Sequence, residues 1–164
     1  MSGSLALAAT AVAAGAMVNR FGGDLRDYDT ASTGPFDHAT ARVQLVSRAG
    51  GATLVLHVRG ADPAVEGQTF GAHLHDGACA TSLPALAGPH YNHDVHGGIT
   101  PVTVSDDTEV WLDITVDADG AGDSSSAVRF APAGGQRSVV IHARPTNPST
   151  GVAGARLACL PVEW

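Results

Sequence analysis

Hydrophobic and polar residues alternate in short runs along most of this chain, and turn-forming residues separate the runs. Such runs, rich in β-branched residues, occupy positions 39–47, 51–60, 108–116, 126–133, 137–144 and 155–162. A period of two is typical of strands with one face buried and the other facing solvent. After residue 20 the chain has no convincing helical periodicity. The pattern therefore predicts an all-β protein.

Clusters of Gly, Asp and Pro join these expected strands. The joins read "SRAGG", "DADGAG" and "APAGGQ", and their residues favour tight turns. Strands that follow one another at regular spacing indicate a sandwich or a barrel. Two longer segments, 76–101 and 143–155, interrupt this spacing, and histidines flank each of them. Because long connections on a rigid β scaffold are where sites are usually built, we expect these two to be functional loops.

The composition limits the possible partners. The chain has 164 residues, which suits one domain with a real core, and its formal net charge is −7. All nine basic residues are arginines. Nucleic acid and anionic membranes both require a concentrated basic surface, so the composition argues against either as a partner.

An uncharged apolar run occupies residues 5–17. The run is too short to span a bilayer, so no integral membrane span is expected. It has the length and small-residue finish of a signal-peptide core, although the usual preceding basic residues are missing. A start codon assigned too far downstream and an ordinary N-terminal helix are the alternatives. We expect a signal peptide or flexible N-terminus over 1–20, a β domain over 21–164, and export, which an even pair of cysteines also favours.

Histidines are concentrated in one part of the chain. Five of the eight lie between residues 73 and 96, and His142 ends another expected strand. His73 and His75 are two apart, so a strand presents both on one face. Imidazole is the commonest protein metal ligand and suits zinc or copper. The pattern predicts a metal site, whereas His57 and His38 are expected to be solvated surface residues.

Four short blocks together resemble a known family. "GAHLHDGAC", "AGPHYN", "SVVIHA" and "GVAGARLAC" occur in the order of the signature blocks of the copper/zinc superoxide dismutase family, over roughly residues 40–162. The resemblance implies a Greek-key β-barrel or sandwich of about eight antiparallel strands with two long functional loops. It also implies superoxide as the small-molecule substrate and copper as the cofactor.

The resemblance assigns roles residue by residue. The blocks match His73, His75, His90 and His142 to the copper ligands, with His90 at the position of the bridging histidine. His90 would also deliver a proton to the departing peroxide. Arg156 matches the arginine that attracts and orients superoxide, and it would act as a clamp with permanent charge. Cys79 and Cys159 match the family's disulfide pair.

The chain departs from the family at the zinc site. His96 has a context like that of the first zinc ligand, the later histidine has no counterpart, and Val110 stands near the expected aspartate. The loop "RPTNPSTG" lacks the acidic residue that links the two metals in the family. These losses resemble the copper-only members, so we expect a mononuclear copper site with zinc absent or weakly bound.

A rebuilt second metal site is the alternative. It would use His90 with His93 or His96 and Asp94. Without zinc, another group has to orient His90, and the natural hypothesis is a nearby carboxylate such as Asp94 or Glu109.

Superoxide dismutation at copper is therefore the function that the sequence favours. The alternatives are a non-enzymatic protein for copper storage or delivery, and a structural β domain with a vestigial site. Arg156 distinguishes the first two, because metal handling does not require it. The sequence does not indicate an oligomeric state.

Overall fold

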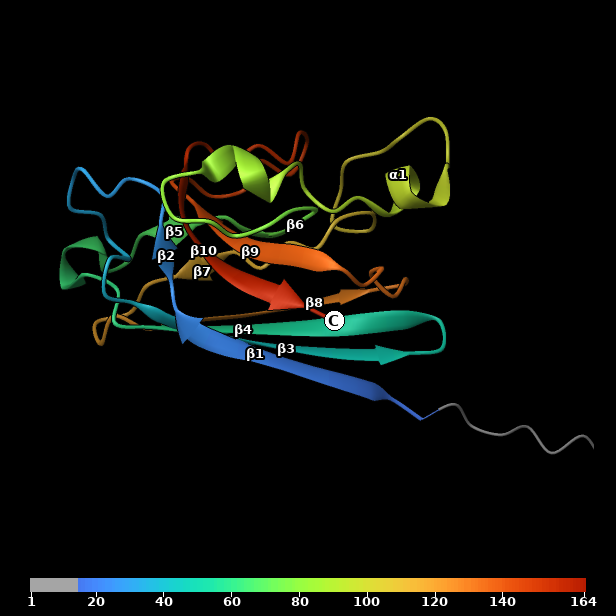
Figure 1. Ribbon diagram of the computed structural model, residues 1–164, viewed down its shortest axis with the longest axis horizontal. Coiled ribbons are helices and arrows are strands. Elements are labelled where there is room, and N and C mark those ends of the chain that lie inside the picture. Colours follow the sequence, from blue (N-terminus) through green and yellow to red (C-terminus); the bar gives the residue numbers. More distant parts are fainter. Residues whose placement is uncertain (1–14) are drawn as a thin grey trace, which may run out of the picture.

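The computed structural model describes residues 15–164, which form two stacked antiparallel β-sheets (Figure 1). Sheet A has the order β1-β3-β4-β8 and consists of β1 (Met17–Asp24), β3 (Thr40–Arg48), β4 (Gly51–Arg59) and β8 (Gly122–Val128). Sheet B has the order β2-β10-β9-β6 and consists of β2 (Arg26–Asp27), β10 (Arg156–Glu163), β9 (Gln136–His142) and β6 (Ala72–His75). A two-stranded sheet pairs β5 (Thr69–Phe70) with β7 (Ile114–Thr115).

The predicted all-β antiparallel class is confirmed. The described residues contain ten strands rather than about eight. Three of these strands, β2, β5 and β7, are only two residues long. The neighbouring strands β4 and β8, like β9 and β6, are not consecutive in sequence, as Greek-key connections require.

The alternating apolar side chains of β3 and β4 form part of the core of the sandwich. Val43 and Leu45 of β3 are 2% and 1% exposed, and they pair across the sheet with Leu56 and Leu54 of β4. Residues between them face outward, so a register shift by one residue would expose the whole apolar set. Burial of each such side chain stabilises the fold by roughly 1.5–3 kcal/mol.

Strand β9 is buried on both faces. Val139 and Ile141 belong to the sandwich core, whereas Val140 packs in a second cluster with the Cys79–Cys159 disulfide. The outer face of sheet B is therefore covered by chain segments rather than by solvent. Figure 1 shows the covering loops on the opposite side of the molecule from sheet A.

The first long loop contains two short helices, η2 (Pro84–Ala87) and α1 (His93–Gly97). Gly77 lies against the carbonyl group of Leu86, so that a Cβ at this position would overlap it. The predicted disulfide between Cys79 and Cys159 is present and ties this loop to β10. A third short helix, η1 (Pro63–Val65), follows β4.

Two expected strands differ from the structure. Only β7 is regular within 108–116, and the rest of that segment contacts β6 through one isolated bridge, His73 with Trp111, and single hydrogen bonds such as Leu112 N to Ala72 O. The strand expected over 126–133 is wrong at both ends: it begins at Gly122, because pairing with β4 includes the serine run "DSSS", and it ends with that pairing, at Val128.

The N-terminal strand falls partly inside the segment expected to be a signal peptide or flexible N-terminus. β1 begins at Met17, and it pairs with β3 from Met17 opposite Ser47 to Asp24 opposite Thr40. The β structure thus starts before residue 21, and most of the expected signal segment, residues 1–14, lies outside the described residues. Among the described helices, none has the length and apolar character needed to cross a bilayer.

Candidate metal centre

The fold brings four histidines from three parts of the chain together. His73 and His75 come from β6, His90 follows η2, and His142 ends β9, which pairs with β6. One nitrogen from each ring lies within 4.8 Å of the corresponding nitrogens of the other three. In the described part of the chain, this is the one group of three or more potential ligands with the geometry to hold a metal ion.

The inward nitrogens have the spacing of metal ligands. His73 Nδ1 lies 2.9 Å from His90 Nε2, and His75 Nε2 lies 3.2 Å from His142 Nε2. Two nitrogens bound at about 2.0–2.1 Å to one ion, at a right angle, would be roughly 3 Å apart. These two distances therefore match the spacing expected in a four-nitrogen metal site.

The opposite nitrogen of each ring contacts an oxygen atom. The pairs are His73 Nε2 with Thr146 Oγ1 (2.6 Å), His75 Nδ1 with Gly88 O (3.1 Å), His90 Nδ1 with Glu109 Oε2 (2.9 Å) and His142 Nδ1 with Gly154 O (3.2 Å). Carbonyl and carboxylate oxygens only accept, so three of these rings carry their proton on the outward nitrogen. The Thr146 hydroxyl donates to Asp113 Oδ1 and therefore accepts from His73. Four neutral rings thus turn four lone pairs toward one point, an arrangement that a bound cation satisfies.

Burial keeps three of these rings neutral. His73 and His75 are fully buried, and burial together with the neighbouring histidines lowers the pKa of each to about 2. Burial likewise lowers the pKa of His142 to about 4. The side chain of His90 is 19% exposed, which makes it the member of the cluster that reaches solvent.

Glu109 is the carboxylate that orients His90. Besides accepting from His90, its carboxylate accepts from Trp111 Nε1 at 2.9 Å and from Asn92 Nδ2 at 3.3 Å. Burial raises the pKa of Glu109, but hydrogen bonds from His90 and Trp111 outweigh burial and leave the pKa below its usual value. The second carboxylate considered from the sequence, Asp94, instead accepts from the backbone and hydroxyl of Thr103.

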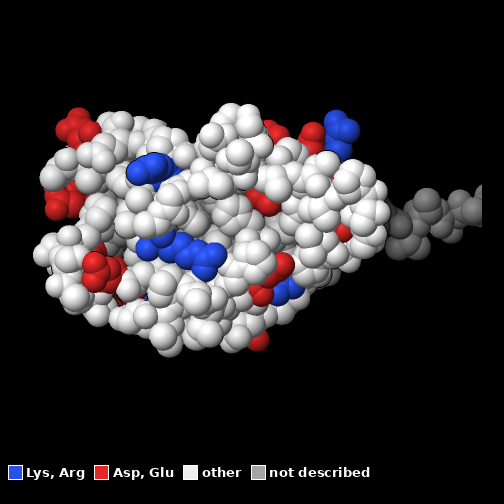
Figure 2. Space-filling view, turned by 90° about the horizontal axis from the view of Figure 1, so that it is seen from above, with Lys and Arg blue, Asp and Glu red and all other residues white. Residues whose placement is uncertain are grey.

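Arg156 lies beside the cluster. It is the cross-strand partner of His142, at a bulge where β10 meets β9. Its guanidinium group donates to the carbonyl oxygens of Pro84 and Gly88, and the Gly88 oxygen also accepts from His75. Figure 2 looks onto the side of the molecule that carries η2 and α1, where much of the surface is uncharged and arginines are few. Each fixed cation on this side therefore has a large influence on an anion approaching it.

The residues of the alternative second site lie apart from one another. His96 Nε2 pairs with Asp76 at 2.8 Å, and its ring stacks on Tyr91. His93 stacks on Phe130, with 4.5 Å between ring centroids. With Asp94 engaged by Thr103, these side chains make separate contacts and do not converge on His90.

The sequence did not predict several polar groups that surround the cluster. Asp113 accepts from the backbone and hydroxyl of Thr146 and so fixes the group that holds His73. Trp111 and Asn92 hold Glu109. Alternation was the available signal, because Glu109, Trp111 and Asp113 are two apart and an extended segment turns them to one side.

Comparison with known proteins supports the fold. No protein-family model matches the chain, and a search of curated proteins finds no match. Among solved structures, the crystal structure of a double mutant of a SOD-like protein from Bacillus subtilis is similar, with a TM-score of 0.59 and 19% sequence identity. The match covers 87% of this chain and 97% of that chain. At this identity, the similarity shows a SOD-like β-sandwich fold.

Proposed function

We propose that this protein is a copper-dependent superoxide dismutase, which converts superoxide to dioxygen and hydrogen peroxide. The observation that carries the proposal is the convergence of four neutral imidazole nitrogens beside Arg156. The resemblance of four sequence blocks to the copper/zinc superoxide dismutase family supports the same reaction.

Copper suits both the donor set and the reaction. His73, His75, His90 and His142 would hold it, since imidazole nitrogens bind copper strongly. Copper, when bound, supplies the one-electron couple that the reaction requires, whereas zinc has no redox chemistry. The Glu109 carboxylate occupies the His90 nitrogen that a second metal would need, which supports a mononuclear site.

Arg156 would attract and orient the substrate. Superoxide is an anion and the chain has a net charge of −7, so approach to the site depends on local cations. A guanidinium group stays charged at every physiological pH, and two carbonyl groups fix its position here.

His90 is placed to handle the proton that peroxide formation requires. It is the most exposed ring of the cluster, and its Nε2 points inward while Nδ1 is held by Glu109. When Nε2 takes up a proton, the ring becomes cationic, and the neighbouring carboxylate stabilises that charge. The proton is then available at Nε2 for the departing product.

We also propose that the protein is exported. The Cys79–Cys159 disulfide supports this assignment, because disulfides persist mainly in oxidising compartments.

The decisive experiment combines metal analysis with turnover. Purified protein is loaded with copper, metal content per chain is measured, and superoxide decay is followed by stopped flow. We expect one copper per chain and decay well above that given by the same amount of copper on a His142→Gln variant. A His57→Gln variant is the matched control, because His57 is an exposed histidine paired with Asp123. Tight copper binding without dismutation would instead support copper storage or delivery.

A further inference from the structure

The outer face of sheet A carries a concentration of arginines that the net charge of the chain conceals. The strands of this sheet contain Arg20, Arg42, Arg48 and Arg59 and only two acidic residues, Asp24 and Asp123. That leaves five arginines and fourteen acidic residues for the rest of the sequence. One face of an acidic protein is therefore basic.

Strand register makes these arginines neighbours. Arg42 lies directly opposite His57 of β4, and Arg20 lies opposite Gln44, two positions along β3 from Arg42. Directly opposite side chains are about 5 Å apart at Cβ, and diagonal ones about 7–8 Å. Arg59 follows His57 by two residues on the same face. Arg20, Arg42 and Arg59 thus lie close together, and Arg48, six residues along β3 from Arg42, extends this basic strip on the same face.

Acidic side chains compensate only part of this strip. Asp123 pairs with Arg59 at 2.7 Å and with His57 at 2.7 Å. Arg20, Arg42 and Arg48 form no ion pair with any other described residue. Like charges on neighbouring strands destabilise a sheet, so an anionic partner would relieve this repulsion.

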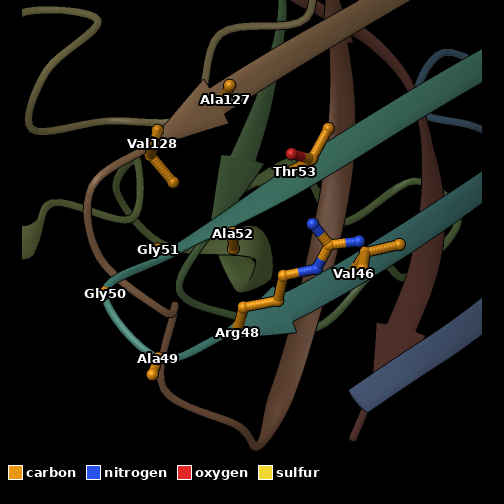
Figure 3. Close-up of a pocket in the computed structure, with 9 residues that line it drawn as sticks. All are labelled: Val46, Arg48, Ala49, Gly50, Gly51, Ala52, Thr53, Ala127 and Val128. Carbon is orange, nitrogen blue, oxygen red and sulfur yellow. The ribbon is translucent and has the colours of Figure 1, made fainter. Parts of the chain in front are cut away.

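The surface is also shaped to receive a thin ligand. A depression of about 360 Å³ is lined by Thr40, Ala41, Arg42, His57 and Arg59. A second hollow lies at the β3–β4 hairpin, where Figure 3 shows the Arg48 side chain extending back along β3 toward Val46. Arg129, which directly follows β8, is exposed close to Gly51 of this hairpin and extends the basic strip.

We propose that the outer face of sheet A binds a linear anionic polysaccharide. The outward positions of its strands carry no Phe, Tyr or Trp side chain on which nucleobases could stack. Val46 and Val55 on this face are half-buried and Val18 is exposed, so the face has far fewer protruding apolar groups than a membrane-binding surface. The acidic remainder of the molecule would repel a broad polyanion such as duplex DNA, whereas a single polysaccharide chain fits along the strip.

The proposal does not depend on the proposed function. The strip lies on the opposite side of the molecule from the loops of the metal centre (Figure 1). Bound polymer would therefore leave the histidine cluster accessible, and the protein would be retained where that polymer is found.

Binding to labelled dextran sulfate and polygalacturonate, followed by fluorescence anisotropy, tests the proposal. We expect both to bind at low ionic strength, with affinity falling steadily as salt is added, while neutral dextran does not bind. The Arg20→Gln/Arg42→Gln variant should bind about thirtyfold more weakly, because each cation near an anionic surface contributes roughly fivefold in affinity. The Arg20→Lys/Arg42→Lys variant should bind like the unaltered chain.

The matched control changes net charge equally on the other side of the molecule. Thr81→Glu/Ala85→Glu also makes the chain two charges more negative, at two exposed positions around η2. At 0.1 M salt, where the Debye length is roughly 10 Å, we expect this variant to bind within about twofold of the unaltered chain, because its added charges lie on the opposite side of the molecule from the strip. Equal weakening in both variants would overturn the proposal, as would tighter binding to duplex DNA or to anionic phospholipid vesicles than to either polysaccharide.

Discussion

Glu109 accepts a hydrogen bond from Nδ1 of His90 at 2.9 Å, on the side of the ring that faces away from the other three histidines. The carboxylate also accepts hydrogen bonds from Trp111 and Asn92, so His90 is one of three groups that fix its position. His90 thereby keeps its proton on Nδ1 and its lone pair toward the cluster. The Glu109 carboxylate thus orients the His90 ring.

Replacing Glu109 tests this role directly. Glu109→Gln preserves size and an acceptor oxygen but removes the charge that stabilises a protonated His90. We expect the rate of superoxide decay at equal copper loading to fall by about 10- to 100-fold, the usual effect of losing a group that orients a metal ligand. Asp106→Asn is the control, because Asp106 is an exposed carboxylate on the same segment. Equal rates for the two variants would exclude a specific role for Glu109.

The hydroxyl of Thr146 should contribute to copper affinity. It accepts from His73 and donates to Asp113, so it fixes the tautomer that turns Nδ1 of His73 inward. Thr146→Val keeps the shape but removes the hydroxyl group, and we expect copper affinity to fall by about tenfold or more. Thr146→Ser should restore it. Competition with a chelator gives the affinity, and the copper electron paramagnetic resonance spectrum reports the ligand geometry. Loss of affinity in both variants would point to packing rather than hydrogen bonding.

Arg156 should accelerate the reaction through its charge. Arg156→Gln removes the cation beside the cluster, and we expect a rate decrease of about tenfold together with a weaker dependence on salt. Arg156→Lys keeps the charge and should retain most of the salt dependence, although it loses contacts with Pro84 and Gly88. Arg48→Gln removes an arginine from the opposite face and is the control. A salt dependence unchanged in Arg156→Gln would contradict steering by this residue.

The disulfide should stabilise the fold substantially. Cys79 and Cys159 are 80 residues apart, and closing a loop of that length stabilises a protein by about 4 kcal/mol in the chain-entropy model. Cys79→Ala/Cys159→Ala should lose a free energy of unfolding of this order, measured by urea denaturation of the metal-free protein. Reduced protein with both cysteines provides the comparison, because it keeps the side-chain volume. A loss below about 1 kcal/mol would indicate that residual structure in the unfolded chain removes the entropic effect.

Local sequence was sufficient for the parts of this protein that follow from strand geometry. Alternation in β3 and β4 predicted which side chains are buried, because successive side chains in any strand point to opposite faces. The blocks around His73, His90, His142 and Cys79 predicted the histidine cluster and the disulfide through their resemblance to a family. These features depend on residue identity at fixed spacing.

Tertiary structure alone decided which groups form hydrogen bonds with the histidines of the cluster. From the sequence, Asp94 and Glu109 were equivalent candidates for the carboxylate that orients His90. The backbone path brings Glu109 to His90, whereas Asp94 accepts a hydrogen bond from Thr103. Hydrogen bonds require atoms within about 3 Å, and sequence separation carries no information at that precision.

The distribution of charge shows the same division. Sequence determined a net charge of −7 and nine arginines, from which a basic surface is not expected. The pairing of β1, β3, β4 and β8 gathered four of those arginines on one face. Composition sums charges over the whole molecule, whereas a partner responds to the charges within a Debye length of about 10 Å, and only the folded chain determines which these are.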